Sequence, residues 1–152
     1  MTVHPEDRVT AFVAADTVTV WRMVSDITRM GEWSPECVKC EWLGEPGAVG
    51  STFKGHNKQG WMKWSTTAKV LSAERGKEFA FATMNGDREG TRWSYTFEGT
   101  GPTTVTESFE SISTPKLVEI AEKLFLRNRQ AQLEQGMAKT LAAIKAAAER
   151  KA

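Results

Sequence analysis

Glu107 has the most distinctive chemical setting in this sequence. Within the predicted strand Thr104–Glu110, Val105 and Phe109 share one face, and the two-residue repeat of a strand places Glu107 between them. A carboxylate among apolar side chains is costly unless it has a hydrogen-bonding partner or water. Burial also favours the neutral acid, and a neutral acid can transfer a proton or bind a polar atom of a ligand. Glu107 is therefore the candidate for acid–base chemistry or ligand contact.

The only two cysteines, Cys37 and Cys40, have the spacing of a CxxC motif. The apolar–polar alternation of residues 38–42 predicts a strand around them. In a regular strand, residues i and i+3 point to opposite faces and lie roughly 10 Å apart, which is too far for a disulfide. Only His4 and His56 could complete a metal site, and nothing in the sequence places either of them with the cysteines. We therefore expect no redox or zinc site, and no metal or cofactor.

Alternation of apolar and polar side chains, interrupted by Gly, Pro and Asn, predicts strands that would position these residues. The predicted strands are Arg8–Ala15, Val38–Leu43, Ser51–Asn57, Met62–Leu71, Glu78–Thr83, Arg92–Glu98 and Thr104–Glu110. Helical spacing predicts a short helix from Asp16 to Ser25, and a second short helix or loop at Asp26–Glu36. Since no parallel crossover follows the early helices, we expect an antiparallel sheet with one apolar face.

A helical segment at 114–148 is the only element large enough to cover that sheet. Thr114-Pro115 provides a start signal, and helical spacing gives the segment a face of large apolar residues. That face contains Leu126, Leu133, Met137, Leu141 and Ile144. A straight helix of about 50 Å would exceed a compact chain of this size, so we expect a bend or break near Leu124–Asn128.

These elements predict an α+β fold in which a curved seven-stranded antiparallel sheet wraps around the terminal helix. Residues 1–152 are expected to form one domain, with a loose N-terminus at residues 1–7. The net charge of +1 gives no reason to expect nucleic acid as a partner. Without a long apolar run or signal peptide, we expect a cytoplasmic protein with no stable membrane insertion. The sequence leaves monomer and homodimer open.

A large aromatic surface on the inner face, with a few inward polar groups, is typical of a small-molecule cavity. The candidate ligand-binding residues are Trp33, Phe53, Asn57, Trp64, Phe79, Phe81, Trp93, Tyr95, Glu107, Gln130, Leu133 and Met137. Two structural alternatives stay open. The aromatic residues could form an ordinary core, and Glu107 could simply join the strands by bonding Asn57, Trp93 or Tyr95.

Five stretches resemble the START-like, or SRPBCC, superfamily, and in particular bacterial polyketide cyclase/dehydrase-like proteins. They are Val20–Ile27, Gly31–Glu36, Pro46–Gly55, Trp93–Glu98 and Val105–Glu110. The resemblance implies a helix-grip fold with a ligand cavity between the sheet, the C-terminal helix and the two short helices. Members bind lipids, polyketides, hormones and other apolar molecules, and a minority are enzymes. No shared catalytic motif transfers to numbered positions here.

Three functional hypotheses follow. The first is binding of a small hydrophobic or amphipathic ligand, such as a lipid or polyketide-like metabolite. The second is a cyclase or dehydratase in which Glu107 is the general acid or base, with Asn57, Tyr95 or Gln130 orienting a carbonyl or stabilising an oxyanion. The third is a protein-interaction domain without a ligand, which a fully packed interior would favour.

Overall fold

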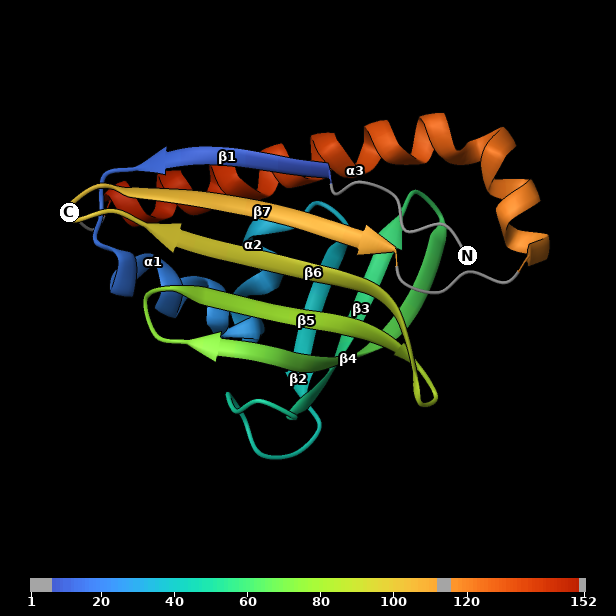
Figure 1. Ribbon diagram of the computed structural model, residues 1–152, viewed down its shortest axis with the longest axis horizontal. Coiled ribbons are helices and arrows are strands. Elements are labelled where there is room, and N and C mark those ends of the chain that lie inside the picture. The colour runs from blue at the N-terminus through green and yellow to red at the C-terminus, as the bar shows by residue number, and fades with distance from the viewer. Residues whose placement is uncertain (1–6, 112–115, 151–152) are drawn as a thin grey trace.

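The computed structural model describes residues 7–111 and 116–150, and the side chains of residues 8–110 and 133–150. Seven antiparallel strands form one sheet in the order β1-β7-β6-β5-β4-β3-β2 (Figure 1). The strands are β1 (Asp7–Val13), β2 (Cys37–Trp42), β3 (Thr52–Gln59), β4 (Met62–Glu74), β5 (Glu78–Asn85), β6 (Arg88–Glu98) and β7 (Thr103–Ser111). All seven predicted strands are confirmed, most of them with slightly different ends.

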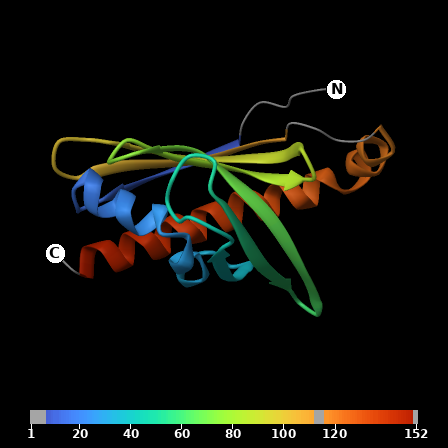
Figure 2. The ribbon, with the colours of Figure 1, turned by 90° about the horizontal axis from the view of Figure 1, so that it is seen from below.

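The short helices begin where the sequence places aspartate caps. Helix α1 (Thr17–Ser25) starts after Asp16, whose side chain accepts a 2.7 Å hydrogen bond from the Thr19 backbone N–H. Asp26 accepts in the same way from Thr28, at 3.2 Å, and begins the single 3₁₀ turn η1 (Ile27–Arg29). A last turn, α2 (Met30–Trp33), leads towards β2. All of these elements lie on the same side of the sheet as α3 (Figure 2).

Helix α3 (Lys116–Arg150) is one continuous helix, and its N-terminal part turns at an angle to the rest (Figure 1), so the structure has the expected bend rather than a break. Met137, Leu141, Ile144 and Ala148 are each at most 2% exposed, so the predicted apolar face is the buried one over this part of the helix. The Thr114-Pro115 start signal and residues 1–6 of the expected loose N-terminus lie outside the described residues, whereas Asp7, also expected to be loose, begins β1. Across the described chain, no helix combines the length and apolar character needed to span a membrane.

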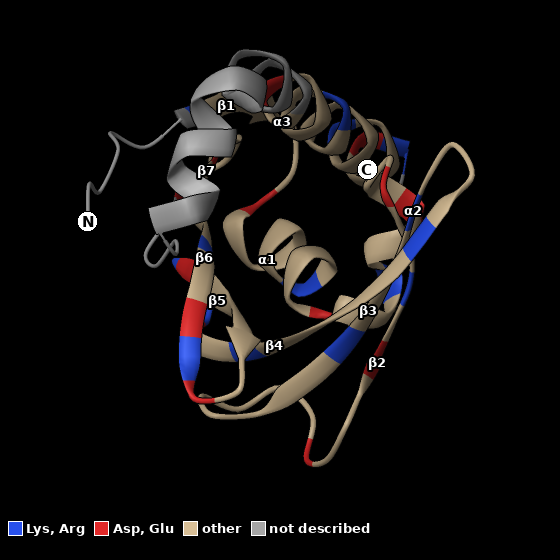
Figure 3. Ribbon diagram, turned by 90° about the vertical axis from the view of Figure 1, so that its right-hand side faces the viewer, with Lys and Arg blue, Asp and Glu red and all other residues tan. Residues whose placement is uncertain are grey.

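The sheet is strongly curved, so its two ends approach each other. Figure 3 shows it curling from β1 round to β2, with α3 lying across the gap between those ends. Register shifts in β4 (between Val70 and Ser72) and β5 (between Ala82 and Met84) mark bulges, which bend a strand and increase its twist. The expected helix-grip architecture is confirmed.

Packing of α3 against the sheet predicts a large effect of one core substitution. Leu141→Ala should destabilise the protein by about 2–5 kcal/mol, because it removes a fully buried side chain and leaves a cavity. Lys139→Ala, on the exposed side of the same helix, should change stability by less than about 0.5 kcal/mol. Urea unfolding measures both. Equal effects would show that α3 does not contribute the core face described above.

Candidate functional site

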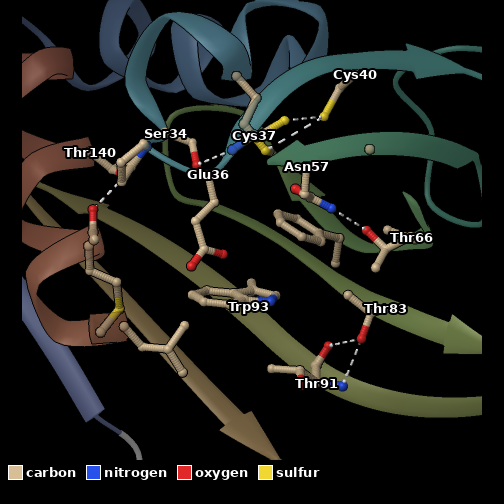
Figure 4. Close-up of a pocket in the computed structure, with 18 of the residues that line it drawn as sticks. Ser34, Glu36, Cys37, Cys40, Asn57, Thr66, Thr83, Thr91, Trp93 and Thr140 are labelled. Carbon is tan, nitrogen blue, oxygen red and sulfur yellow. Dashed lines mark hydrogen bonds between the residues drawn. The ribbon is translucent and has the colours of Figure 1, made fainter. Parts of the chain in front are cut away.

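A pocket of about 310 Å³ lies between the inner face of the sheet, the segment linking α2 to β2, and α3 (Figure 4). Strands β2 to β7 all contribute to its wall. Apolar and aromatic side chains form much of the lining, with several polar groups among them. The volume falls at the lower end of the range for small-molecule sites, which is about 300–1,000 Å³.

Most of the residues predicted from the sequence border this pocket. They are Phe53, Asn57, Trp64, Phe81, Trp93, Tyr95, Glu107, Leu133 and Met137. The two-residue repeat therefore predicted the inward face of β3 to β7 correctly. Gln130 lies outside the residues whose side chains the structure describes.

Trp33 and Phe79 do not border the pocket and instead belong to the packed core. Phe79 is fully buried at the end of β5 that α1 covers, where Trp21 Nε1 donates a 2.9 Å hydrogen bond to the Glu78 carbonyl. Trp33 is 6% exposed, and the Arg29 guanidinium lies 4.7 Å from its ring centroid. Both were predicted to lie in the ligand wall, because periodicity indicates which face of an element is apolar but not whether that face meets the core or the pocket.

Glu107 and Tyr95 are directly opposite each other on β7 and β6. The Tyr95 hydroxyl donates a 2.8 Å hydrogen bond to Glu107 Oε2. Glu107 is 3% exposed, and Oε1 has no hydrogen-bond partner among the described residues. The predicted inward orientation is therefore correct, and of the three partners considered for Glu107 the structure selects Tyr95.

Burial controls the protonation of this pair. It raises the pKa of Glu107 to about 8, and the hydrogen bond from Tyr95 opposes that rise only in part. Burial, together with the neighbouring carboxyl, also raises the pKa of Tyr95 well above its usual value. Both groups are therefore predominantly neutral at pH 7. The site holds a carboxylic acid rather than a carboxylate.

Other polar side chains in the wall are held by local hydrogen bonds. Asn57 Nδ2 donates to Thr66 Oγ1 at 3.3 Å, across the β3–β4 pair. Thr140 Oγ1 donates to the Gly136 carbonyl at 2.8 Å, within α3. Thr66 and Thr140 were not proposed from the sequence, although the repeat from Trp64 and the helical spacing from Leu133 and Met137 place them on the inner faces.

Glu36 is a second acidic residue of the pocket, and sequence analysis missed it. It comes directly after Pro35 in the link between α2 and β2, where no periodic pattern indicates a direction. Figure 4 shows its side chain extending into the pocket towards the ring of Trp93. Because Glu36 is more exposed than Glu107, the pocket has one carboxyl group nearer solvent and one that is buried.

The predicted geometry of the cysteine pair, with the two side chains on opposite faces, is wrong. Cys37 and Cys40 both border the pocket, and their Sγ atoms lie 3.2 Å apart. The register shifts between Cys37 and Lys39, so Val38 is an extra residue in a bulge and both cysteines turn to the same face. No group of three His, Cys, Asp or Glu side chains among the described residues is arranged to hold a metal ion.

The fold and pocket can be compared with known proteins. The model of the family described as polyketide cyclase / dehydrase and lipid transport matches residues 6–149. The chain belongs to this family. A solved polyketide cyclase-like protein from Corynebacterium glutamicum is 33% identical, with a TM-score of 0.59, and the similarity covers 92% of this chain and 88% of that one. The search of curated proteins found no match.

Two more distant structures share the fold. The aromatase/cyclase Zhui from Streptomyces sp. R1128 has a TM-score of 0.72 at 16% identity, covering 99% of this chain and 96% of its own. The di-domain aromatase/cyclase StfQ of the steffimycin biosynthetic pathway has a TM-score of 0.77 at 14% identity. The match covers 96% of this chain and 51% of StfQ, so the chain spans about half of that protein.

Protonation of Glu107 predicts a dependence of stability on pH. The pKa is raised from 4.5 to about 8 on folding, so the stabilisation it gives is complete below 4.5 and is lost as the pH rises through 8. Between about pH 5 and about pH 8, the wild type should lose stability relative to Glu107→Gln, by up to about 1.4 kcal/mol per pH unit. Urea unfolding at several pH values measures this difference. A constant difference across the range would contradict a buried neutral acid.

Proposed function

We propose that this protein binds a small hydrophobic or amphipathic ligand, of lipid or polyketide-like character, in the pocket between the sheet and α3. The observation that carries this proposal is the pocket of about 310 Å³ together with the unpartnered Oε1 of Glu107 in its wall. A buried polar atom without a partner costs free energy, and a ligand that bonds it would recover that loss.

The wall chemistry supports a ligand with an extended apolar part. Phe53 and Phe81 pack edge to face with ring centroids 5.2 Å apart, and Trp93 contacts Phe109 in a tilted arrangement at 5.4 Å. Aromatic rings held in this way give a rigid apolar surface that loses little entropy when a ligand packs against it. The family also includes lipid transport in its description, which agrees with an apolar ligand.

The neutral state of Glu107 specifies the polar part of the ligand. Oε2 accepts the hydrogen bond of Tyr95, so the proton of the acid is available on Oε1. That proton favours a carbonyl or hydroxyl oxygen on the ligand. The proposed ligand is therefore an apolar molecule with at least one oxygen that meets Glu107.

Catalysis is the second candidate, and it is favoured by the raised pKa of Glu107. An acid with a pKa of about 8 can both donate and accept a proton near neutral pH. The likeness to aromatase/cyclases concerns the fold, and it suggests the substrate class to test. The pocket weighs against the third hypothesis, a protein-interaction domain with a closed interior.

Filling the pocket tests ligand binding. Thr66 faces the pocket on β4, whereas Thr67 is on the exposed face, so Thr66→Phe and Thr67→Phe are matched substitutions on opposite faces of one strand. Medium-chain fatty acids and aromatic polyketide analogues should stabilise the wild type and Thr67→Phe by about 2.7 kcal/mol at a hundredfold excess over Kd. Thr66→Phe should fold and lose this stabilisation. Thermal unfolding measures the stabilisation by each ligand, and isothermal titration calorimetry measures its affinity. Equal binding by the two variants would refute the pocket as the site.

Glu107→Gln separates binding from catalysis. If Glu107 is a general acid, turnover of an aromatic polyketide mimic should fall about 10²–10⁴-fold in this variant, while the mimic still binds. If the protein only binds its ligand, no turnover occurs in either form, and Glu107→Gln changes affinity alone. Chromatography of the reaction mixture, with calorimetric affinities as the control, measures both outcomes.

A further inference from the structure

The sulfur atoms of Cys37 and Cys40 are the second reactive group of the pocket, and neither hypothesis above uses them. Both cysteines are free thiols, 7% and 4% exposed, and they are the only cysteines of the chain. Their Sγ atoms lie 3.2 Å apart, already in contact, so a disulfide of about 2.05 Å requires an approach of only about 1.2 Å. The bulge at Val38 produces this contact.

The surroundings leave space on the pocket side of the pair. Gly55 is directly opposite Cys40 on β3, and a Cβ built there would lie 3.6 Å from Cys40 Sγ. That distance is an ordinary van der Waals contact, so the glycine leaves open the space that a side chain would fill beside the sulfur. Met30 Sδ, 3.8 Å from Cys40 Sγ, forms another part of the surroundings. Because the sulfurs are shielded from bulk solvent but border the pocket, a reagent reaches them through the pocket and must be small.

The hydrogen bond between the two sulfurs shifts their pKa values in opposite directions. The hydrogen bond from Cys40 lowers the pKa of Cys37, with help from the Lys39 backbone, and outweighs the opposing effect of burial. The same hydrogen bond and burial raise the pKa of Cys40. The thiolate is the nucleophilic form of cysteine, and the lowered pKa favours that form at Cys37.

We propose that Cys37 and Cys40 are a site of reversible oxidation, converted to an intramolecular disulfide by a small hydroperoxide that enters the pocket. The Cys37 thiolate attacks the terminal peroxide oxygen, the O–O bond breaks, and the departing alkoxide takes a proton to give an alcohol and a Cys37 sulfenic acid. The Cys40 sulfur then displaces the hydroxyl group and loses its proton, so a disulfide and water form. In total, two thiols and one hydroperoxide give one disulfide, one alcohol and one water.

The return reaction needs a small thiol. One molecule attacks the disulfide to form a mixed disulfide, and a second releases the protein as the dithiol, with oxidation of the two small thiols to their own disulfide. This inference depends on the pocket as a route but not on the identity of any ligand.

Mass spectrometry of the intact protein tests the proposal. Wild-type protein treated with an equimolar amount of tert-butyl hydroperoxide should lose the mass of two hydrogen atoms and both titratable thiols, and dithiothreitol should restore them. Cys37→Ser and Cys40→Ser should each lose this reaction completely. Oxidised wild type should migrate as a monomer on a non-reducing gel. Persistence of both thiols, or a disulfide formed only between chains, would overturn the proposal.

The route through the pocket has its own test with the two phenylalanine variants. Thr66→Phe should slow disulfide formation by at least tenfold, because residue 66 is close to Gly55 beside Cys40, whereas Thr67→Phe should react like the wild type. Equal rates in all three proteins would overturn entry by the pocket. Since no ligand is added, failure of the ligand-binding experiment leaves this result unaffected.

Discussion

One helix cannot cover a sheet of seven strands. Strands in a sheet are about 4.8 Å apart, so seven of them span about 29 Å, whereas a helix with its side chains is about 10–12 Å wide. Curling the sheet brings more of its inner face within reach of α3 (Figure 3), and α1 covers one end of the sheet (Figure 1). Between β2–β7, the link after α2 and the middle of α3, the cover is incomplete. The pocket is the result of this mismatch in width.

A carboxyl group inside the sheet is tolerated because of its partner and its protonation. Glu107 is opposite Tyr95 on one neighbouring strand and opposite Val9 on the other, so the strands supply one hydrogen-bonding side chain and one apolar one. The buried acid remains protonated, which avoids the larger cost of a buried charge. A valine or leucine at this position would satisfy the packing of β7. The acid instead gives the β7 part of the pocket wall a polar group.

The sequence predicted the fold because its main signals are local. Alternation along the strands gives the inner face of β3 to β7, including Glu107, and helical spacing gives the buried face of α3 from Leu133 onward. The prediction errors arise where the orientation or surroundings of a side chain depend on contacts between distant segments. Phe79 points inward but lies at the end of β5 that α1 covers, Trp33 packs into the core, and Glu36 follows a proline in an irregular link. The extra residue at Val38 reverses the expected orientation of Cys37, and no sequence period reveals a bulge.

The bulge in β2 also bears on how the sheet ends. Both β1 and β2 are edge strands, and a regular edge offers unpaired backbone groups to which another chain can add a strand. At β2, the bulge interrupts that row of donors and acceptors. Beside the end of β1, α3 supplies an ion pair instead, in which Lys145 Nζ lies 2.7 Å from Glu149 Oε2. Lys145 also donates to the Phe12 carbonyl at 2.6 Å, and Glu149 accepts from the Ala14 N–H at 2.9 Å. The two edges are thus protected against intermolecular β-pairing and aggregation by different means, one by an irregular backbone and the other by an ion pair on a helix.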